Sequence, residues 1–166
     1  MSIRLTIVAT HPIQYQSPWF RYLTANRPEI DLTVLYASRP TPAQQAVDFG
    51  GSFESDTPLL EGYKWHVVRD CMPEADFSVG SFRALDVPEI GRALMDTRPD
   101  VVLVFGWHSI TLVRAILACR RRGVPVVYRG DTSLLGRPRG WRGIAWHVRT
   151  RALLRLYSAH LAVGRL

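Results

Sequence analysis

The 166-residue chain contains little cysteine, a single lysine (Lys64) and no long hydrophobic run. Its two cysteines, Cys71 and Cys119, are too few for a disulfide framework, which favours reduced thiols in a cytoplasmic protein. No apolar stretch approaches the ~20 residues that a membrane-spanning helix requires. The first residues lack a charged region followed by an apolar one, so we expect residues 3–9 to form a strand and not a signal peptide.

Several signatures of common enzyme classes are also absent. No G-x-G-x-x-G follows the first predicted strand, and no G-x-x-x-x-G-K-[ST] occurs, which argues against dinucleotide-binding and P-loop proteins. No Cys/His cluster has the spacing of a zinc site, and no G-x-S-x-G marks a hydrolase. We therefore expect neither a metal nor a cofactor in this domain.

Acidic residues are scarce in the second part of the chain. Residues 1–100 carry nine basic and thirteen acidic side chains, whereas residues 101–166 carry twelve arginines and one acid, so the net charges are −4 and +11. An arginine-rich half suggests an anionic partner such as phosphate, an acidic membrane surface or nucleic acid. No groove-reading helix or stacking sheet is evident, so we do not expect nucleic acid as a partner.

Strand-like and helix-like patterns alternate along the chain. Short apolar runs predict strands at 3–9, 32–37, 65–68, 101–105, 126–128 and 160–163. Capping residues and helical periodicity predict helices at 17–26, 86–97, 109–122 and 140–157. Ser17 is the expected N-cap of the first helix, and residues 86–89 resemble a capping box for the second. The alternation predicts an α/β, Rossmann-like, doubly wound and mostly parallel sheet with helices on both faces.

Polar side chains follow the first predicted strand where it ends. His11, Gln14 and Tyr15 lie between that strand and a helix, and the backbone N–H groups of a helix N-terminus suit anionic or hydroxyl-rich ligands. Because open parallel sheets bind ligands at the carboxyl ends of their strands, these three are candidate substrate-binding residues. The alternative is that His11 and Gln14 only satisfy backbone groups of the loop.

The strand at 101–105 ends in the same way, with Gly106, Trp107 and His108. This strand is almost wholly apolar, as a central parallel strand should be. Glycine lets a ligand approach the backbone, Trp107 is suited to stack on a sugar ring, and His108 can donate to a hydroxyl or phosphate. In the alternative interpretation, the histidine only caps the following helix.

Arg129 and Asp131 follow the strand at 126–128, at the same edge. An ion pair between them is the simplest explanation for Asp131, the one acid after residue 100. An exposed pair of this kind contributes only ~0–1 kcal/mol, so binding of an acceptor hydroxyl remains the functional alternative. Both residues are therefore candidate substrate-binding residues.

The predicted helix at 140–157 carries two apolar strips with arginines between them. We expect one strip to pack against the sheet; it consists of Trp141, Ile144, Ala145, Val148, Ala152 and Leu156. The other strip consists of Trp146, Leu153 and Tyr157 and either lies on an anionic membrane surface or packs against a further domain. The candidate membrane contacts are Arg137, Arg139, Arg142, Trp146 and Arg149.

Four segments occur along the chain in a familiar order. They are THPIQYQSP at 10–18, LLEGY at 59–63, GWHS at 106–109 and RGD at 129–131. Together they resemble the N-terminal, acceptor-side domain of family-4-like glycosyltransferases of the GT-B fold, and the resemblance covers essentially the whole chain. It implies a two-domain enzyme whose C-terminal, donor-binding domain is not in this sequence.

The resemblance also implies an activity. Such enzymes move a sugar from a nucleotide-sugar donor to a glycan or lipid-linked acceptor, typically without a metal and with retention of anomeric configuration. By this resemblance His108 would be the catalytic residue of the domain, contacting the donor sugar or its phosphate from across the cleft. His11 and Gln14 would line the same cleft, while Asp131 and the segment 38–60 would face the acceptor.

Two other interpretations stay open. A nucleotide-sugar epimerase has the same two-domain plan and needs no acceptor, and a non-catalytic module would bind an anion without chemistry. We expect a cytoplasmic location for the protein. The arginine-rich helix would add peripheral contact with the inner face of the membrane.

Overall fold

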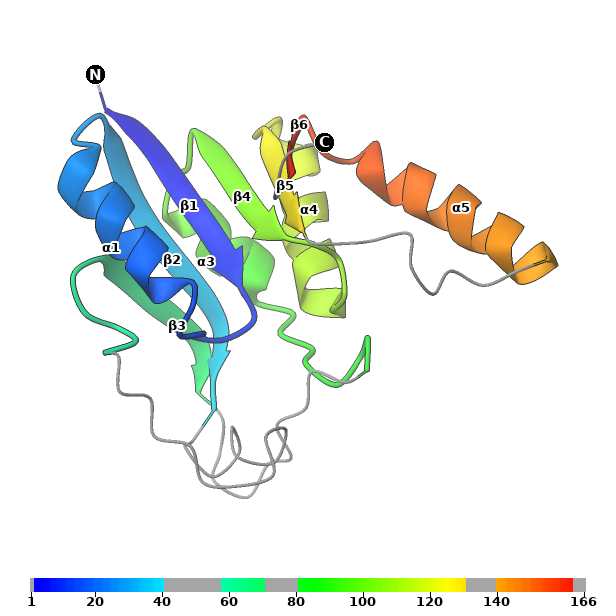
Figure 1. The fold of residues 1–166 in the computed structure, drawn as a ribbon, viewed down its shortest axis with the longest axis horizontal. Helices are drawn as coiled ribbons and strands as arrows, with labels where there is room; N and C mark the ends of the chain where they lie inside the picture. Colours follow the sequence, from blue (N-terminus) through cyan, green and yellow to red (C-terminus); the bar gives the residue numbers. More distant parts are fainter. Residues whose placement is uncertain (1, 41–57, 71–80, 131–139, 163–166) are drawn as a thin grey trace.

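The computed structural model describes residues 2–40, 58–70, 81–130 and 140–162. These residues form an α/β fold around one six-stranded sheet in which every neighbouring pair is parallel (Figure 1). The strands are β1 (Ile3–Ala9), β2 (Ile30–Arg39), β3 (Lys64–Asp70), β4 (Val101–Phe105), β5 (Val126–Gly130) and β6 (Ala159–Ala162). Their order in the sheet is β3-β2-β1-β4-β5-β6, which confirms the Rossmann-like, parallel architecture expected from the sequence.

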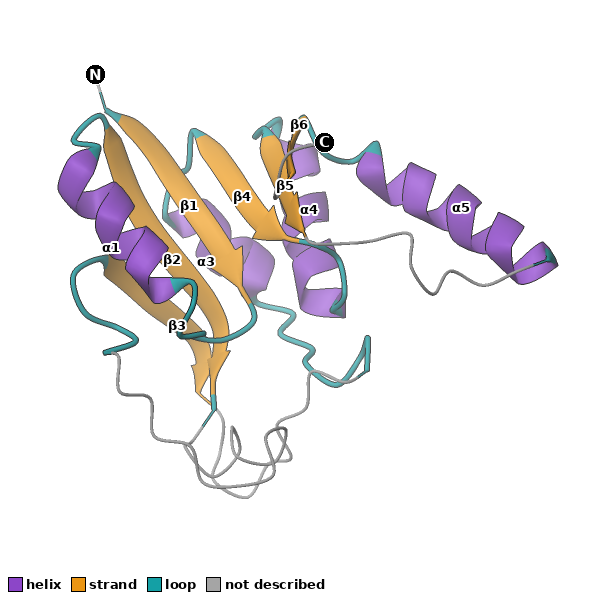
Figure 2. Ribbon diagram, viewed as in Figure 1, coloured by secondary structure: helices purple, strands orange, loops and turns teal. Residues whose placement is uncertain are grey.

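Helices lie on both faces of this sheet (Figure 2). Those described are α1 (Ser17–Asn26), α3 (Ile90–Asp96), α4 (Ile110–Arg122) and α5 (Trp141–Leu154). The α1 helix covers one face, and α3 and α4 pack together on the other. The chain moves one way across the sheet from β1 to β2 and the opposite way from β4 to β5. Because parallel crossovers are right-handed, α1 and α4 must therefore lie on opposite faces.

Alternating side chains of the strands build a core on each face. On β1, Ile7 packs beneath α1, whereas the next residue, Val8, packs on the α3 and α4 side. Phe20 of α1 is fully buried on the first face, and Leu112 and Ile116 of α4 are fully buried on the second. The sheet is thus covered on both sides at its centre, which explains the nearly continuous apolar character of β4.

The helices α1 and α4 begin differently. Ser109 is the N-cap of α4, and its hydroxyl accepts a hydrogen bond from a backbone N–H of the first turn. The prediction that Ser17 caps α1 is wrong, because Gln16 occupies the N-cap position and makes no capping hydrogen bond. Ser17 is instead buried, and its hydroxyl donates to the carbonyl of Leu59 at 2.8 Å.

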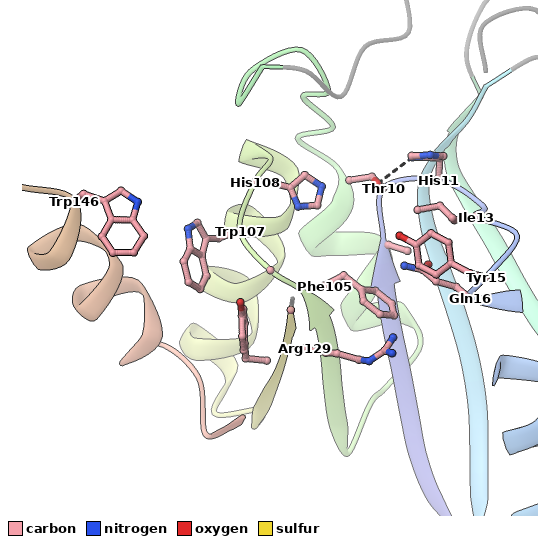
Figure 3. Close-up of a pocket in the computed structure, with 14 residues that line it drawn as sticks. Thr10, His11, Ile13, Tyr15, Gln16, Phe105, Trp107, His108, Arg129 and Trp146 are labelled. Carbon is pink, nitrogen blue, oxygen red and sulfur yellow. Dashed lines mark hydrogen bonds between the residues drawn. The ribbon is translucent and has the colours of Figure 1, made fainter. Parts of the chain in front are cut away.

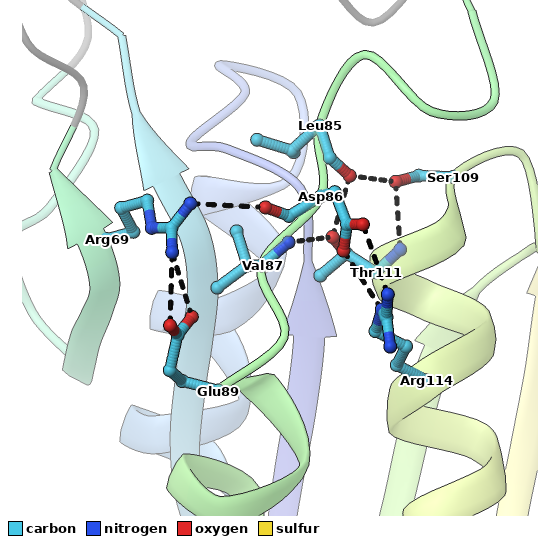
Figure 4. Close-up of polar contacts among 8 residues, drawn as sticks. All are labelled: Arg69, Leu85, Asp86, Val87, Glu89, Ser109, Thr111 and Arg114. Carbon is cyan, nitrogen blue, oxygen red and sulfur yellow. Dashed lines mark hydrogen bonds and ion pairs between the residues drawn. The ribbon is translucent and has the colours of Figure 1, made fainter.

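The capping box predicted at 86–89 is also wrong. The α3 helix starts only after Glu89, whose carboxylate makes no capping hydrogen bond. Figure 4 shows both carboxylates in ion pairs with other elements. Asp86 pairs with Arg114 of α4 at 2.9 Å, and Glu89 pairs with Arg69 of β3 at 3.0 Å. Each carboxylate therefore pairs with an arginine that is distant in the sequence and not with the backbone N–H groups at the start of α3.

The segment before α3 is hydrogen-bonded to the N-terminus of α4. The carbonyl of Leu85 accepts from the hydroxyls of Ser109 at 3.0 Å and Thr111 at 2.7 Å. The Thr111 hydroxyl in turn accepts from the backbone N–H of Val87 at 2.9 Å (Figure 4). All four residues are buried. This network holds the beginning of α4, and with it the turn that follows β4.

The N-terminal end of the α5 helix extends away from the sheet (Figure 1). The prediction that its first strip packs against the sheet is wrong, because Trp141, Ile144 and Val148 are 74%, 68% and 65% exposed. The second strip faces the body of the domain, where Trp146 lines a cavity and Tyr157, just beyond the helix, is buried. None of the helices described here is long and apolar enough to cross a membrane.

Thr111→Val should destabilise the fold, because it removes the hydroxyl that pairs with the buried N–H of Val87. We expect the free energy of unfolding to fall by about 1–3 kcal/mol, the usual cost of an unsatisfied buried polar group. Urea denaturation measures this loss. Thr111→Ser keeps the hydroxyl and should lose only about 1 kcal/mol for the missing methyl group. Equal losses in the two variants would contradict the role given to the hydroxyl.

Candidate functional site

A cavity of about 510 Å³ opens at the carboxyl edge of the sheet. It lies between the ends of β1 and β4, where the strand order reverses. Open α/β sheets bind ligands at this position, and the volume is in the range of small-molecule sites. Figure 3 shows its walls: the loop after β1, the turn after β4, the end of β5 and one side chain of α5.

The loop after β1 contributes His11, Tyr15 and Gln16 to the wall. Thr10 Oγ1 lies 3.0 Å from His11 Nδ1, so a hydrogen bond orients the imidazole. Gln14 is exposed and does not line the cavity, whereas Gln16 is buried and does. Gln16 was not among the predicted site residues. Its position directly before the first helical turn was the sequence feature that could have indicated it.

The turn after β4 brings Gly106, Trp107 and His108 together at the cavity, as the sequence predicts. Gly106 has a φ of +71°, in the left-handed region that favours glycine. Its carbonyl accepts a hydrogen bond from the hydroxyl of Tyr157 at 2.9 Å. Trp107 stacks on Tyr128 with 5.2 Å between the ring centroids, so its indole forms a fixed aromatic wall.

His108 is exposed at the junction of two cavities. It lines the 510 Å³ cavity and also a neighbouring one of about 450 Å³. The surrounding walls remove part of its hydration, which lowers the pKa of the imidazole below its ordinary value of 6.5. The neutral form of the ring is therefore favoured, and it has one nitrogen that donates a hydrogen bond and one that accepts.

Arg129 extends from the end of β5 between two aromatic rings. Its guanidinium carbon lies 4.8 Å from the ring centroid of Trp19 and 5.3 Å from that of Phe105. Within the described residues it has no carboxylate partner. Asp131, the partner considered from the sequence, lies outside the described residues. The cation is thus held in place by rings and not by an acid.

The arginine-rich helix contributes to the site from the other side. Figure 3 shows Trp146 extending from α5 toward Trp107, and Trp146 lines the cavity. Arg149 lines the neighbouring 450 Å³ cavity, together with His108. Of the remaining membrane-contact candidates, Arg137 and Arg139 lie outside the described residues, and only the helical backbone of Arg142 is described.

No described residue that lines the cavity is acidic. The described residues that line it include one arginine and two histidines but no acid. In the described part of the chain, no three His, Cys, Asp or Glu side chains gather into a cluster that could hold a metal. Cys119 lies in the core, and burial raises the pKa of its thiol to about 11, so it is not an activated nucleophile. The arrangement suits polar or anionic ligands with hydroxyl groups.

No family model matches the chain, and no curated protein matches it. The function is therefore inferred from the fold and from the geometry of this cavity.

The pKa of His108 can be tested directly. In an NMR titration the imidazole should have its midpoint below 6.5, because partial loss of hydration disfavours the charged ring. A short unfolded peptide with the same local sequence is the reference and should titrate near the ordinary value. A midpoint in the chain above that of the peptide would contradict the lowered pKa of His108.

Proposed function

We propose that this chain is the N-terminal, acceptor-side domain of a cytoplasmic glycosyltransferase that moves a sugar from a nucleotide-sugar donor to a glycan or lipid-linked acceptor. The observation that carries the proposal is the polar cavity at the reversal of strand order, lined by His108 and the aromatic face of Trp107. Aromatic walls suit sugar rings, and a neutral imidazole suits their hydroxyl groups. The order of the four sequence segments supports the same activity.

The reaction proposed here replaces one bond to the anomeric carbon with another. The bond from this carbon to the donor phosphate breaks, and a bond to the acceptor oxygen forms on the same face of the sugar. The acceptor's proton passes to the departing phosphate oxygen, so no carboxylate base is required of this domain. His108 would hold a donor oxygen by a hydrogen bond, and the turn at Gly106 would keep the imidazole in place.

A second domain would complete the site. The cavity is open toward the carboxyl edge of the sheet, and the donor nucleotide would be held from the opposite side of a cleft. Closure of the two domains would exclude water and bring the donor to the acceptor. This arrangement also fits an epimerase, which differs in releasing product without an acceptor.

The uncovered side of α5 supports peripheral membrane contact. Trp141, Ile144 and Val148 are strongly exposed, and Arg151 and Arg155 continue the same helical side toward the C-terminus. No described residue of α5 is acidic, so the side is both apolar and basic. We propose that this side, and not the side that carries Trp146, lies on an anionic lipid surface. A lipid-linked acceptor would then be presented at the cavity from the membrane.

His108→Ala should lower glycosyl transfer by roughly 10²–10³-fold while leaving the circular dichroism spectrum unchanged, because it removes a hydrogen bond to the reacting donor. The assay uses the protein translated from the full reading frame and measures nucleoside diphosphate release from a panel of nucleotide sugars with acceptors. Arg121→Gln, at the exposed end of α4, is the matched control. Full turnover by His108→Ala would remove this residue from the mechanism. Product release without any acceptor would favour the epimerase.

The membrane proposal predicts binding to vesicles of anionic lipid in a co-sedimentation assay. Each arginine near such a surface contributes about 1 kcal/mol, so Arg151→Gln with Arg155→Gln should weaken binding by about 30-fold. Ile144→Ser with Val148→Ser should also weaken it, because these side chains would be buried in the interface. Tyr22→Ser, at an exposed position on α1, is the control and should bind normally. Binding that is absent, or that does not respond to salt, would contradict the proposal.

A further inference from the structure

The cavity contains a cation that the rest of the described chain does not neutralise. The guanidinium of Arg129 lies against the rings of Trp19 and Phe105 and has no ion-pair partner among the described residues. Other arginines have such partners: Arg114, for example, makes two hydrogen bonds with the carboxylate of Asp86. Stacking fixes the guanidinium plane but uses none of its N–H donors, so these donors stay available to a ligand.

The side-chain carbonyl oxygen of Gln16 is a second unsatisfied group that lines the cavity. Gln16 is only 4% exposed, and its Oε1 is buried without a hydrogen-bond partner in the described structure. Buried side-chain amides are nearly always satisfied, because an unpaired carbonyl loses its hydration without compensation. Gln16 lines the cavity, so a ligand can supply the missing partner.

Both groups line the cavity, and the first turn of α1 connects them. Gln16 and Trp19 are three residues apart, which places them on the same side of the first turn of α1. The ring of Trp19 is the one nearest to the Arg129 guanidinium. Figure 3 shows the Arg129 side chain extending from β5 toward the end of β1, beneath Phe105. A small ligand at this end of the cavity can therefore meet both side chains.

We infer that Arg129 and Gln16 form a subsite for an oxyanion carried by a hydroxylated molecule. The N–H groups of Arg129 would bind a carboxylate or a phosphate, and the amide of Gln16 would bind a hydroxyl group of the same molecule. The absence of an acid among the described lining residues favours an anion over a neutral sugar. This inference rests on the proposed function, for which it specifies the acceptor: a sugar acid or a sugar phosphate.

The binding experiment uses the whole chain and four probes: glucose 1-phosphate, glucuronate, inorganic phosphate and glucose. NMR titration measures the dissociation constant of each. At least one of the two acidic sugars should bind more tightly than glucose, and the stronger of them identifies the anion as phosphate or carboxylate. Binding of glucose as tight as that of both acidic sugars would overturn the inference.

Three variants test the two side chains. Arg129→Gln should weaken the binding of the acidic sugar by about 10- to 100-fold, the usual loss for a hydrogen bond to a charged group. Arg129→Lys should recover only part of this loss, because an ammonium cannot form the planar, two-pronged contact. Arg121→Gln removes the same charge far from the cavity and should have no effect. Equal effects of Arg129→Gln and Arg121→Gln would overturn the inference.

Gln16→Leu separates a binding role from a structural one. Leucine has a similar size and leaves no buried unpaired carbonyl, so the melting temperature without ligand should rise or stay the same. Binding of the acidic sugar should weaken, while binding of inorganic phosphate should not change. A large loss of stability with unchanged sugar binding would assign Gln16 to the fold and overturn its role in the subsite.

The outcomes also distinguish this inference from the proposed function. If the full-length protein binds the anion through Arg129 but transfers no sugar, the subsite is supported and the glycosyltransferase proposal is contradicted. If the protein transfers sugar to neutral acceptors and Arg129→Gln does not slow this transfer, the glycosyltransferase proposal is supported and the subsite is contradicted.

Discussion

The reversal of strand order between β1 and β4 determines where the helices and the cavity lie. Right-handed crossovers on the two sides of this point place α1 and α4 on opposite faces of the sheet. The chain therefore leaves the carboxyl ends of β1 and β4 in diverging directions, and a cavity opens between the two connections. The residues that follow both strands line this cavity because the topology brings them there.

Contacts from distant parts of the chain hold the cavity walls in place. The hydroxyl of Tyr157 fixes the carbonyl of Gly106, and the Thr111 hydroxyl ties the start of α4 to the segment before α3. Arg129 is positioned by the rings of two other elements. Side chains held in this way lose little freedom when a ligand binds, so more of the contact energy contributes to affinity.

The distribution of charge along the chain has a structural consequence. Acids before residue 101 form ion pairs at the surface, such as Asp31 with Lys64 and Asp100 with Arg4. The hydrogen bond from Arg4 lowers the pKa of Asp100 to about 2. The twelve arginines of residues 101–166 have only one acid, Asp131, in the same part of the sequence. In the described structure, this half contributes the free guanidinium of Arg129 to the cavity and exposed basic side chains to α5. The imbalance thus concentrates positive charge at the cavity and at the α5 side that we assign to lipid.

The α/β class, the strands and the polar turns at their carboxyl ends are predictable from the sequence, because apolar periodicity and strand termination are local properties. The position of Gln16, and not Gln14, at the cavity depends on how α1 packs against the sheet, so local sequence could not predict it. It also decided that Asp86 pairs with Arg114 and does not cap α3, because the competing partner lies 28 residues away. Which side of α5 is exposed also depends on the tertiary structure. Both of its strips are apolar, and only the shape of the domain determines which one it can bury.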